Sequence, residues 1–544
     1  MPRERPAGWM ICHASNPARW FVPERTTLAT VSFEFESRRL PKAHSLPVLP
    51  PRSEVESLLL EESEKKEKCG VFGIWGSPEA SQITYQGLFA QQHRGQESAG
   101  IAVTDGDDLH AHAGMGLVSQ VFSQRRLKED LKGHGAVGHI RYSTTGSSEV
   151  CNAQPLLQRF SLGPVAVAHN GNLINAAAIR RQYEEHGAIF QTATDTEVIV
   201  HMLAKPTHAQ KPDPLGHVLL HLQGAFSLIF LFADRIEAAR DPWGIRPLSI
   251  GQLPTGQYVV ASETCAFDAT GAAFVRDVEP GEIVTIHDGG IDSRRYTEPA
   301  DPQARCLFEH VYFANPASIL WGRNVHLVRE AMGRQLAREA PADVDSVMPM
   351  PDSGRSAALG FAKESQLPFD EAIVPNRFVG RTFILPSQAD RDRMVALKLN
   401  IIEPLVSDRR IVVVDDSIVR GTTTRSKMRA LRRAGAKEIH LRISCPPIRH
   451  PCFYGIDFAT RDELIAGDKT VDEIAGFLEV DSLHYLSLEG MAECTGIPLS
   501  DACSACWTGN YKISVSEIQT KFSFERRQLR MFSDTAAANG AKSS

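Results

Sequence analysis

The sequence lacks any apolar run of the roughly 18 residues that a membrane-spanning helix needs. Cysteine is also scarce, with 10 in 544 residues, which excludes a scaffold held together by disulfides. Cationic residues are not in excess, because 59 Lys and Arg stand against 65 Asp and Glu and the net charge is −6. We therefore expect neither a membrane nor a nucleic-acid partner.

The composition is otherwise that of a globular protein, with 42% hydrophobic and 23% charged residues, and the length suggests several domains. The first 68 residues are the exception. Residues 40–53 are rich in proline and residues 61–68 are a charge run, so this part is predicted to be an extension without a core. The chain starts without the apolar segment of a secretory signal. We expect a cytoplasmic protein, with weak organelle targeting by residues 1–60 as the alternative.

Two different patterns follow the extension. Short strand-like runs alternate with helical patterns from residue 69 to about residue 300, which is typical of a strand-rich α/β sandwich. From about residue 320 each strand leads through a turn into a helix, and this order predicts a parallel sheet. The predicted boundaries are 1–68 for the extension or propeptide, 69–305 and 306–510 for two domains, and 511–544 for a C-terminal tail.

Cys69 opens the first ordered strand, directly after the extension. If residues 1–68 were removed, Cys69 would carry a free α-amino group with a pKa of about 7.7–8.0. That amine could take the proton of the neighbouring thiol, so that one residue would supply both nucleophile and base. The alternative is a buried structural cysteine at the start of a strand.

Four sequence blocks follow Cys69 in order: QQHRGQESAGIAV (91–103), GHIRYSTTG (138–146), AHNGNL (168–173) and TDTEV (194–198). Together with Cys69 they resemble the glutaminase domain of the N-terminal-nucleophile glutamine amidotransferases. The resemblance implies that the Asn170 amide and the Gly171 N–H stabilise a tetrahedral oxyanion. It also implies that Arg141 binds the α-carboxylate of glutamine and that Asp195 binds its α-ammonium group. Taken singly, Arg141 also fits a surface salt bridge, Asn170–Gly171 a hairpin turn and Asp195 a helix N-cap.

A second motif, IVVVDDSIVRGTTT (411–424), places two carboxylates after a β-branched strand and before a small polar, Gly-containing turn. The backbone N–H groups of residues 418–423 can surround a phosphate at the start of the following helix. Asp415 and Asp416 can bind ribose hydroxyls or Mg²⁺. The motif is not a Walker A loop, because GxxxxGK[ST] is absent. It resembles the phosphoribosyl-diphosphate signature of type I phosphoribosyltransferases.

Two further segments extend this resemblance. MPMPDSG (348–354) resembles the loop that holds diphosphate, and NRFVGRTFILPSQ (376–388) resembles the mobile loop that closes over the substrate and excludes water. The resemblance implies a Mg²⁺ site at Ser353, Asp415 and Asp416. The residues implied to bind phosphoribosyl diphosphate are Asp352, Ser353, Gly354, Arg381, Lys398, Asp415, Asp416, Ser417, Ile418, Val419, Arg420, Gly421, Thr422 and Thr423.

Taken together, residues 69–510 resemble the amidophosphoribosyltransferase family. The family implies an N-terminal-nucleophile hydrolase αββα sandwich (class II glutamine amidotransferase) joined to a type I phosphoribosyltransferase domain with a central parallel sheet. It implies the first committed step of purine synthesis, in which glutamine, 5-phosphoribosyl 1-diphosphate and water give 5-phosphoribosylamine, glutamate and diphosphate. Ammonia would pass from Cys69 to the phosphoribosyl site. One Mg²⁺ per subunit, inhibition by purine nucleotides and a homotetramer or homodimer are also implied.

Four of the other nine cysteines form a further scattered set: Cys306, Cys452, Cys503 and Cys506. By residue type, four thiolates suit either zinc or an iron–sulfur cluster. One branch of the family carries a 4Fe–4S cluster on cysteines in these contexts and has a propeptide before the catalytic cysteine. This chain has both features, so we expect one structural 4Fe–4S cluster per subunit.

The sequence departs from the family pattern at a few positions. The family usually has YFARPDS and KNRY where this chain has Asn315 and Ala317 in YFANPAS and Pro375 in PNRF. We expect these changes to affect regulation more than activity. Two alternatives stay open, namely another class II glutamine amidotransferase, such as the hexosamine synthase type, and a non-enzymatic nucleotide-sensing relative.

Overall fold

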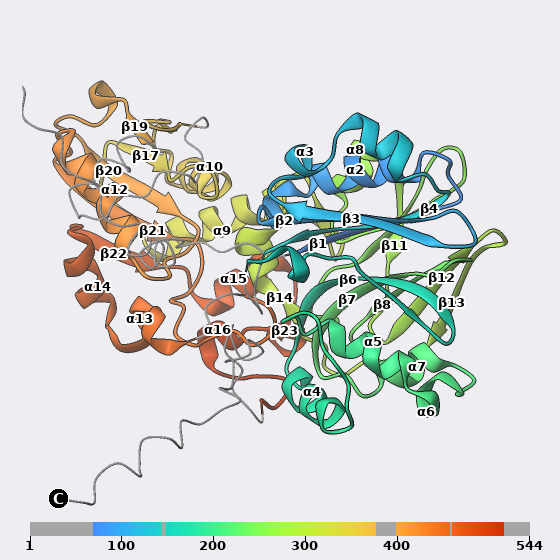
Figure 1. Ribbon diagram of the computed structural model, residues 1–544. Helices are drawn as coiled ribbons and strands as arrows, with labels where there is room; N and C mark the ends of the chain where they lie inside the picture. Colours follow the sequence, from blue (N-terminus) through green and yellow to red (C-terminus); the bar gives the residue numbers. More distant parts are fainter. Residues whose placement is uncertain (1–68, 143–147, 377–398, 457–459, 516–544) are drawn as a thin grey trace, which may run out of the picture. The chain divides into compact units, whose positions relative to one another are not determined.

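The computed structural model describes residues 69–142, 148–376, 399–456 and 460–515 (Figure 1). The extension 1–68, Arg381 and Lys398 lie outside these residues, as does most of the segment predicted to close over the substrate. Within the described ranges, no helix is both long enough and apolar enough to cross a membrane.

Two antiparallel sheets follow Cys69. The first contains, in spatial order, β11 (Ala273–Asp277), β9 (Ser249–Gln252), β10 (Tyr258–Ala261), β1 (Gly70–Trp75), β4 (Gly135–Arg141), β2 (Ser98–Thr104) and β3 (Leu109–Met115). The second contains β13 (Gly290–Arg295), β12 (Glu282–His287), β8 (Ile236–Arg240), β7 (Gly224–Leu231), β6 (Gly163–Leu173) and β5 (Leu156–Phe160). The short strand-like runs expected between residue 69 and about residue 300 correspond to strands of these two sheets.

Successive side chains of a strand point to opposite faces of its sheet, and this alternation explains the layers. In β1, Val71 packs with Ala168 and Ile229 of the second sheet, whereas Phe72 packs on the opposite side with Leu88 of α2 (Ala80–Ala90). The helices α4 (Ala176–Glu185), α5 (Glu197–Ala204), α6 (Pro206–Ala209) and α7 (Pro214–Leu219) belong to the outer side of the second sheet. The layers are therefore helix, sheet, sheet and helix, which confirms the predicted αββα sandwich.

A four-stranded parallel sheet forms later in the chain, also as predicted. Its strands lie in the order β17 (Ser346–Pro349), β20 (Arg410–Asp415), β21 (Glu438–Ile443) and β22 (Ser482–Tyr485). Its longer helices are α9 (Val325–Glu339), α10 (Arg355–Ser365), α12 (Thr422–Arg433), α14 (Val471–Leu478) and α15 (Leu488–Thr495). Strand β20 pairs with β17 on one side and β21 on the other, and its residues Ile411–Asp415 are all buried. Burial of both faces explains why its sequence is a continuous β-branched run rather than an alternating one.

Shorter α-helices and strands connect these elements in the described chain. They are α3 (Val118–Val121), α8 (Cys265–Thr270), α13 (Ile465–Asp468), α16 (Ala505–Thr508), β14 (Arg305–Cys306), β15 (Ile319–Leu320), β16 (Arg323–Asn324), β18 (Ile373–Pro375), β19 (Leu399–Ile401) and β23 (Ala502–Cys503). Strand β14 pairs in parallel with β23, so that Cys306 lies opposite Cys503. Tyr511 and Ile513, at the start of the predicted tail, contact Pro451 and Tyr454.

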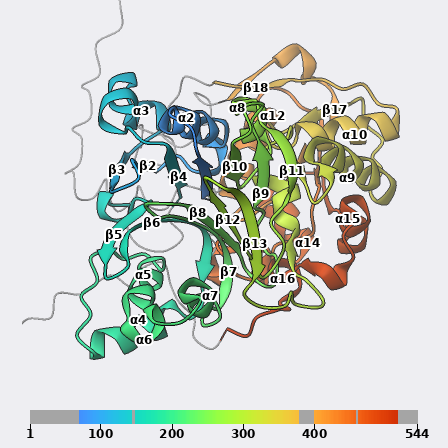
Figure 2. The same ribbon diagram turned by 90° about the vertical axis from the view of Figure 1, so that its right-hand side faces the viewer.

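Helices α9 and α10 lie side by side in both views of the molecule (Figures 1 and 2). Glycine allows this close approach. A Cβ atom on Gly333 of α9 would lie 1.8 Å from the carbonyl oxygen of Ala357, and one on Gly360 of α10 would lie 1.9 Å from the carbonyl oxygen of Glu330. Because both obstacles are backbone atoms, a methyl group can be accommodated only if the helices separate.

Gly333→Ala is therefore expected to lower the free energy of unfolding by about 1–3 kcal/mol, since overpacking forces backbone shifts. Gly476→Ala is the matched control, because Gly476 is also helical but a Cβ there meets nothing within 4 Å. That control is expected to gain about 0.5–1 kcal/mol from helix propensity. Thermal unfolding at one scan rate measures both, and equal melting temperatures for the two variants would contradict the packing argument.

Candidate functional site

Cys69 lies immediately before β1 and is 8% exposed. Its Sγ donates a weak hydrogen bond to the carbonyl oxygen of Tyr142 at 3.5 Å, and the charges of Arg141 and Asp195 act on the thiol. Burial raises the pKa of this thiol to about 11. The thiol is therefore protonated at neutral pH and needs a base before it can act as a nucleophile.

Arg141 and Asp195 lie near Cys69 but come from different elements. Arg141 ends β4, and its Nη1 donates to Glu97 Oε1 at 2.8 Å. Asp195 accepts a hydrogen bond from the Leu173 amide at 2.9 Å. Burial works to raise the pKa of Asp195, but His169 and this amide hold it below its ordinary value, so the carboxylate is charged.

The alternative explanations for Asn170–Gly171 and Asp195 are wrong. Asn170 and Gly171 lie inside β6 rather than in a hairpin turn. Asp195 does not cap α5, because the N-cap is Thr196 and the helix begins at Glu197. Both motifs thus occupy positions that local sequence rules do not explain.

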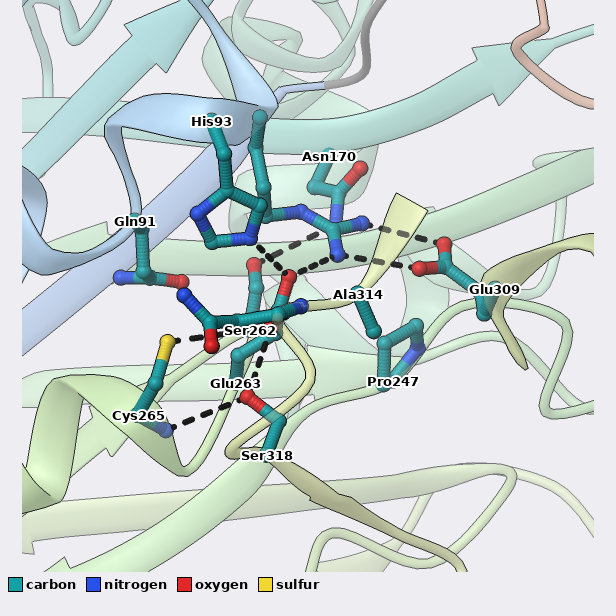
Figure 3. Close-up of polar contacts among 12 residues, drawn as sticks. Gln91, His93, Asn170, Pro247, Ser262, Glu263, Cys265, Glu309, Ala314 and Ser318 are labelled. Atoms are coloured by element: carbon teal, nitrogen blue, oxygen red, sulfur yellow. Dashed lines mark hydrogen bonds and ion pairs between the residues drawn. The ribbon is translucent and has the colours of Figure 1, made fainter. Parts of the chain in front are cut away.

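The Asn170 amide is held in place by a hydroxyl group. Its Nδ2 donates to Ser262 Oγ at 3.2 Å (Figure 3). Ser262 Oγ also accepts from the Val71 amide of β1 at 3.1 Å. A Cβ atom on Gly171 would lie 1.9 Å from the carbonyl oxygen of Ala225, so only glycine fits there. The amide and the glycine N–H are therefore fixed on a strand neighbouring Cys69, as preorganised hydrogen-bond donors must be.

A buried network of charged side chains holds the Cys69 backbone through its carbonyl oxygen. Arg94 Nε donates to the carbonyl oxygen of Cys69 at 3.0 Å. The same guanidinium binds Glu309 through two hydrogen bonds of 2.9 and 3.0 Å and also binds Glu263 (Figure 3). Both carboxylates are completely buried, and they raise the pKa of Arg94 well above its usual range against the effect of burial. Arg94 therefore remains charged.

Arg246 extends this network toward the cysteine cluster. Its Nη1 lies 3.2 Å from Glu309 Oε1 and 3.7 Å from Cys306 Sγ, and its Nη2 donates to the carbonyl oxygen of Tyr454. We call Arg94, Arg246, Glu263 and Glu309 the charge quartet. Its two cations and two anions balance, so the quartet as a group carries no net formal charge.

Glu263 also belongs to a possible metal-binding group. In the described part of the chain, His93, Glu263 and Cys265 form the one group of three such side chains whose ligand atoms all lie within 4.8 Å of one another. Glu263 is already engaged, because His93 Nε2 lies at 2.9 Å and Ser318 Oγ at 2.7 Å (Figure 3). Its ion pair with Arg94 places a fixed positive charge beside the group, which disfavours a cation.

Asp415 and Asp416 lie at the carboxyl end of β20 and are buried. Asp415 Oδ1 accepts from the Asp416 amide at 2.9 Å, and Asp416 accepts from the Ser417 hydroxyl. Burial lowers the pKa of Arg329 to about 10, while the nearby Asp416 carboxylate raises it. The acidic pair thus has a buried cation nearby.

The diphosphate-type loop follows the neighbouring strand. Residues Asp352, Ser353 and Gly354 connect β17 to α10, and the Pro351–Asp352 peptide is cis. A Cβ atom on Gly354 would lie 2.3 Å from the carbonyl oxygen of Val414, so this loop lies directly against the end of β20. Because β17 and β20 are adjacent and parallel, their loops share the sheet edge where ligands usually bind.

The turn after the acidic pair leads into α12 through Gly421, whose φ of 77° is in the left-handed region that glycine favours. Ser417, Ile418, Val419 and Arg420 form the turn, and Thr422 and Thr423 begin the helix. Arg420 is held by Glu463. The backbone N–H groups of this helix start offer a site for an anion.

The four singled-out cysteines also come together, although they are far apart in sequence. Cys306 is paired with Cys503 across β14 and β23, and the other sulfurs act electrostatically on Cys506. Burial raises the pKa of all four thiols. Among these described cysteines, no three sulfur atoms all lie within 4.8 Å of one another. Four thiolates on one zinc would lie about 3.8 Å apart, given Zn–S bonds of about 2.3 Å.

Sequence reasoning missed the partners of Cys69. Arg94 lies within the quoted block QQHRGQ, and Glu309 lies beside Cys306 in RCLFEHVYF, but nothing in either pattern pairs them. Glu263 and Ser262 carry no motif at all. Only the pairing of β1 with β10, whose end precedes these two residues, brings them to Cys69.

Comparisons with known proteins cover most of the chain. Residues 139–269 match the model of a glutamine amidotransferase domain. The chain is 47% identical over 463 residues to the amidophosphoribosyltransferase of Bacillus subtilis, a match that covers 84% of this chain and 97% of the relative. A solved allosteric regulatory enzyme of purine biosynthesis is 46% identical, with a TM-score of 0.80, over 85% of this chain and all of its own. The B. subtilis glutamine phosphoribosylpyrophosphate amidotransferase in complex with ADP and GMP has a TM-score of 0.79 at 46% identity, over 84% of this chain and all of its own.

Glu309→Gln tests the charge quartet. The substitution leaves two buried guanidinium groups with one carboxylate, so the free energy of unfolding is expected to fall by about 3–5 kcal/mol. Glu129→Gln is the control, because Glu129 pairs with Arg125 on the exposed surface and should change stability by less than about 0.5 kcal/mol. Denaturant unfolding followed by circular dichroism measures both. A loss at Glu309 no larger than at Glu129 would mean that the quartet does not stabilise the fold.

Proposed function

The chain belongs to the amidophosphoribosyltransferase family of purine biosynthesis, and from this premise we propose which of its residues carry out the reaction. Glutamine is hydrolysed at Cys69, and the ammonia released is used at Asp415 and Asp416. The observation that carries this assignment is the position of the Cys69 thiol beside Arg141 and Asp195, and the Asn170 amide, fixed by Ser262, supports it.

In the first half-reaction, Cys69 Sγ attacks the carboxamide carbon of glutamine. Once residues 1–68 are removed, the free α-amino group of Cys69 takes the thiol proton and passes it to the leaving ammonia. The Asn170 Nδ2 and Gly171 N–H stabilise the oxyanion of the tetrahedral intermediate. Arg141 and Asp195 bind the two charged groups on the glutamine α-carbon. Water then hydrolyses the thioester and releases glutamate.

In the second half-reaction, the ammonia nitrogen attacks C1 of the phosphoribosyl group. The C1–O bond to diphosphate breaks, and the new ammonium group loses a proton. The loop Asp352–Gly354 and the N–H groups of residues 418–423 bind the phosphate groups, and Asp415 and Asp416 orient the ribose hydroxyls. The shared edge of β17 and β20 supports this arrangement.

A divalent cation fits the same edge. Ser353, Asp415 and Asp416 supply the oxygen ligands that Mg²⁺ prefers, so we assign one Mg²⁺ per subunit to them. When bound, the ion neutralises charge on the diphosphate leaving group. Arg329, buried near Asp416, limits the negative charge that the free site accumulates.

Cys306, Cys452, Cys503 and Cys506 fit a 4Fe–4S cluster, which we assign as one per subunit. Sulfurs more widely spaced than the thiolates of one zinc support a larger group. The Arg246 guanidinium at Cys306 and the Tyr454 amide at 3.4 Å from Cys452 Sγ are suitable hydrogen-bond donors to bound thiolates. When bound, the cluster would join the β14–β23 pair to residues 452–455.

Several properties of the whole enzyme are part of the proposal. Ammonia passes directly between the two sites, and purine nucleotides regulate the enzyme, as the ADP and GMP bound to the similar B. subtilis protein suggest. The chain forms a homotetramer or homodimer. The exposed Phe274 and Val275 on the edge strand β11 support association. No disulfide joins any of the nine described cysteines, which supports a reducing, cytoplasmic location.

Cys69→Ala and Asp416→Asn should separate the two half-reactions. Cys69→Ala is expected to lower glutamine-dependent synthesis by roughly 10³-fold or more, because the nucleophile is lost, and to retain synthesis from ammonia. Asp416→Asn is expected to lower synthesis from either nitrogen source. Cys151→Ala, at an exposed thiol, is the control. Diphosphate release with glutamine or with ammonium chloride measures all three. Loss of ammonia-dependent synthesis in Cys69→Ala would show that the two sites are not separable.

Cys503→Ser tests the cluster. Anaerobically purified protein is expected to contain four irons and four sulfides per chain, and the variant is expected to lose them together with its brown colour. Cys494→Ser is the control, since Cys494 is a free cysteine outside the four. Iron and sulfide analysis measures both variants. Equal iron in Cys503→Ser and the control, or zinc in the native protein, would contradict the assignment.

A further inference from the structure

Gln154 is a buried polar residue that has no part in the reaction as assigned above. It lies two residues before β5 and is 5% exposed. In the antiparallel register of β5 with β6, Leu156 faces Val167, so the position of Gln154 is opposite His169. The ladder ends before this point, and the side chain supplies the missing hydrogen bond, because Gln154 Oε1 accepts from the His169 amide at 2.8 Å.

The other end of the same side chain contacts the residue next to Asp195. A backbone N–H can only donate, so Oε1 faces His169 and Nε2 faces Thr196. Gln154 Nε2 donates to Thr196 Oγ1 at 3.0 Å, and this hydroxyl donates to Asp195 Oδ1 at 3.3 Å. One side-chain amide thus connects the strand that carries Asn170 to the segment that carries Asp195.

The Thr196 hydroxyl is not used for the helix that it precedes. Thr196 is the N-cap of α5, where a threonine ordinarily accepts from a backbone N–H of the first turn, but its side chain makes no capping hydrogen bond. Its oxygen accepts from Gln154 instead, and His169 Nδ1 lies 3.1 Å away. Because the single hydroxyl proton is donated to Asp195, His169 Nδ1 is the second donor. The hydroxyl is therefore held in one orientation.

The backbone carbonyl of His169 is held as well. His139 of β4 has its Nε2 3.0 Å from that oxygen, and since a carbonyl only accepts, Nε2 carries the proton. Both side chains that hold residue 169 are buried. The polar backbone groups immediately before Asn170 and Gly171 are therefore fixed, and a shift of these two residues would break one of the bonds.

We propose that Gln154 is a positioning residue of the glutaminase reaction, whose amide holds the Asn170 and Gly171 donors at a fixed distance from Asp195. The inference rests on the proposed function. Asn170 and Gly171 act on the carboxamide end of glutamine and Asp195 acts on its α-ammonium group, so their separation must match the length of the substrate. Gln154 touches neither end of the substrate and acts through His169 and Thr196.

Gln154→Met tests this, because methionine has a similar length and volume but makes neither hydrogen bond. We expect kcat/KM for glutamine to fall roughly 10- to 100-fold, with a lower kcat because the oxyanion donors shift and a higher KM because Asp195 shifts. Thr196→Val keeps the bond to the His169 amide and removes the one to Asp195, so it is expected to raise KM with little change in kcat.

Gln158→Met is the matched control, since Gln158 is a half-buried glutamine of β5 that faces Val165. It is expected to leave kcat and KM for glutamine unchanged. Synthesis from ammonium chloride is expected to be equal in the native protein and all three variants, which shows that the phosphoribosyl half is folded. Circular dichroism below the melting temperature checks the rest of the fold.

The kinetic constants separate positioning from a purely structural role, which would lower the melting temperature alone. Values of kcat and KM in folded Gln154→Met equal to those of Gln158→Met would overturn the proposal. An unchanged KM for glutamine in Thr196→Val would overturn it independently, whether or not Gln154→Met folds. Native protein that uses ammonia but not glutamine would contradict the proposed function instead.

Discussion

The ion pairs of the charge quartet connect parts of the chain that no strand ladder joins. Arg94 precedes β2, Glu263 follows β10, and Glu309 comes after both antiparallel sheets are complete. Desolvation makes each of these charges costly alone, and only their mutual contacts offset that cost. All four charges of the quartet are therefore paired only when the segment after β14 has packed against the antiparallel sheets. The hydrogen bond from Arg94 to the Cys69 carbonyl depends on the same packing.

Rigid elements position both proposed sites, although the chemistry differs. Cys69 lies directly before β1 of the first sheet and Asn170 lies on β6 of the second, where the close approach of Gly171 to the Ala225 carbonyl leaves no space for displacement. Asp415 lies at the end of a strand that is flanked on both sides. Fixed donors and carboxylates need little reorganisation during the reaction, which is the main electrostatic advantage of an enzyme over water.

Much of this arrangement follows from the sequence, because its motifs are contiguous. The apolar runs gave the strands of both sheet types, and IVVVDDSIVRGTTT contains its own strand, turn and helix start. Long-range pairing is the part that could not be predicted. No local pattern links Arg94 to Glu309, places Asn170–Gly171 inside a strand or brings α9 against α10, since these contacts depend on topology rather than on propensity.

The chain position of Glu309 has a consequence for protein synthesis. A growing chain that has emerged only as far as residue 305 contains Arg94, Arg246 and Glu263, which are two cations and one anion. The fourth charge is made later, and the Tyr454 carbonyl that binds Arg246 later still. The hydrogen-bonded support of the Cys69 carbonyl through Arg94 is therefore complete only after the segment that contains Glu309 has been made. Folding of the two antiparallel sheets alone, during synthesis, leaves one buried guanidinium of the quartet without its carboxylate partner.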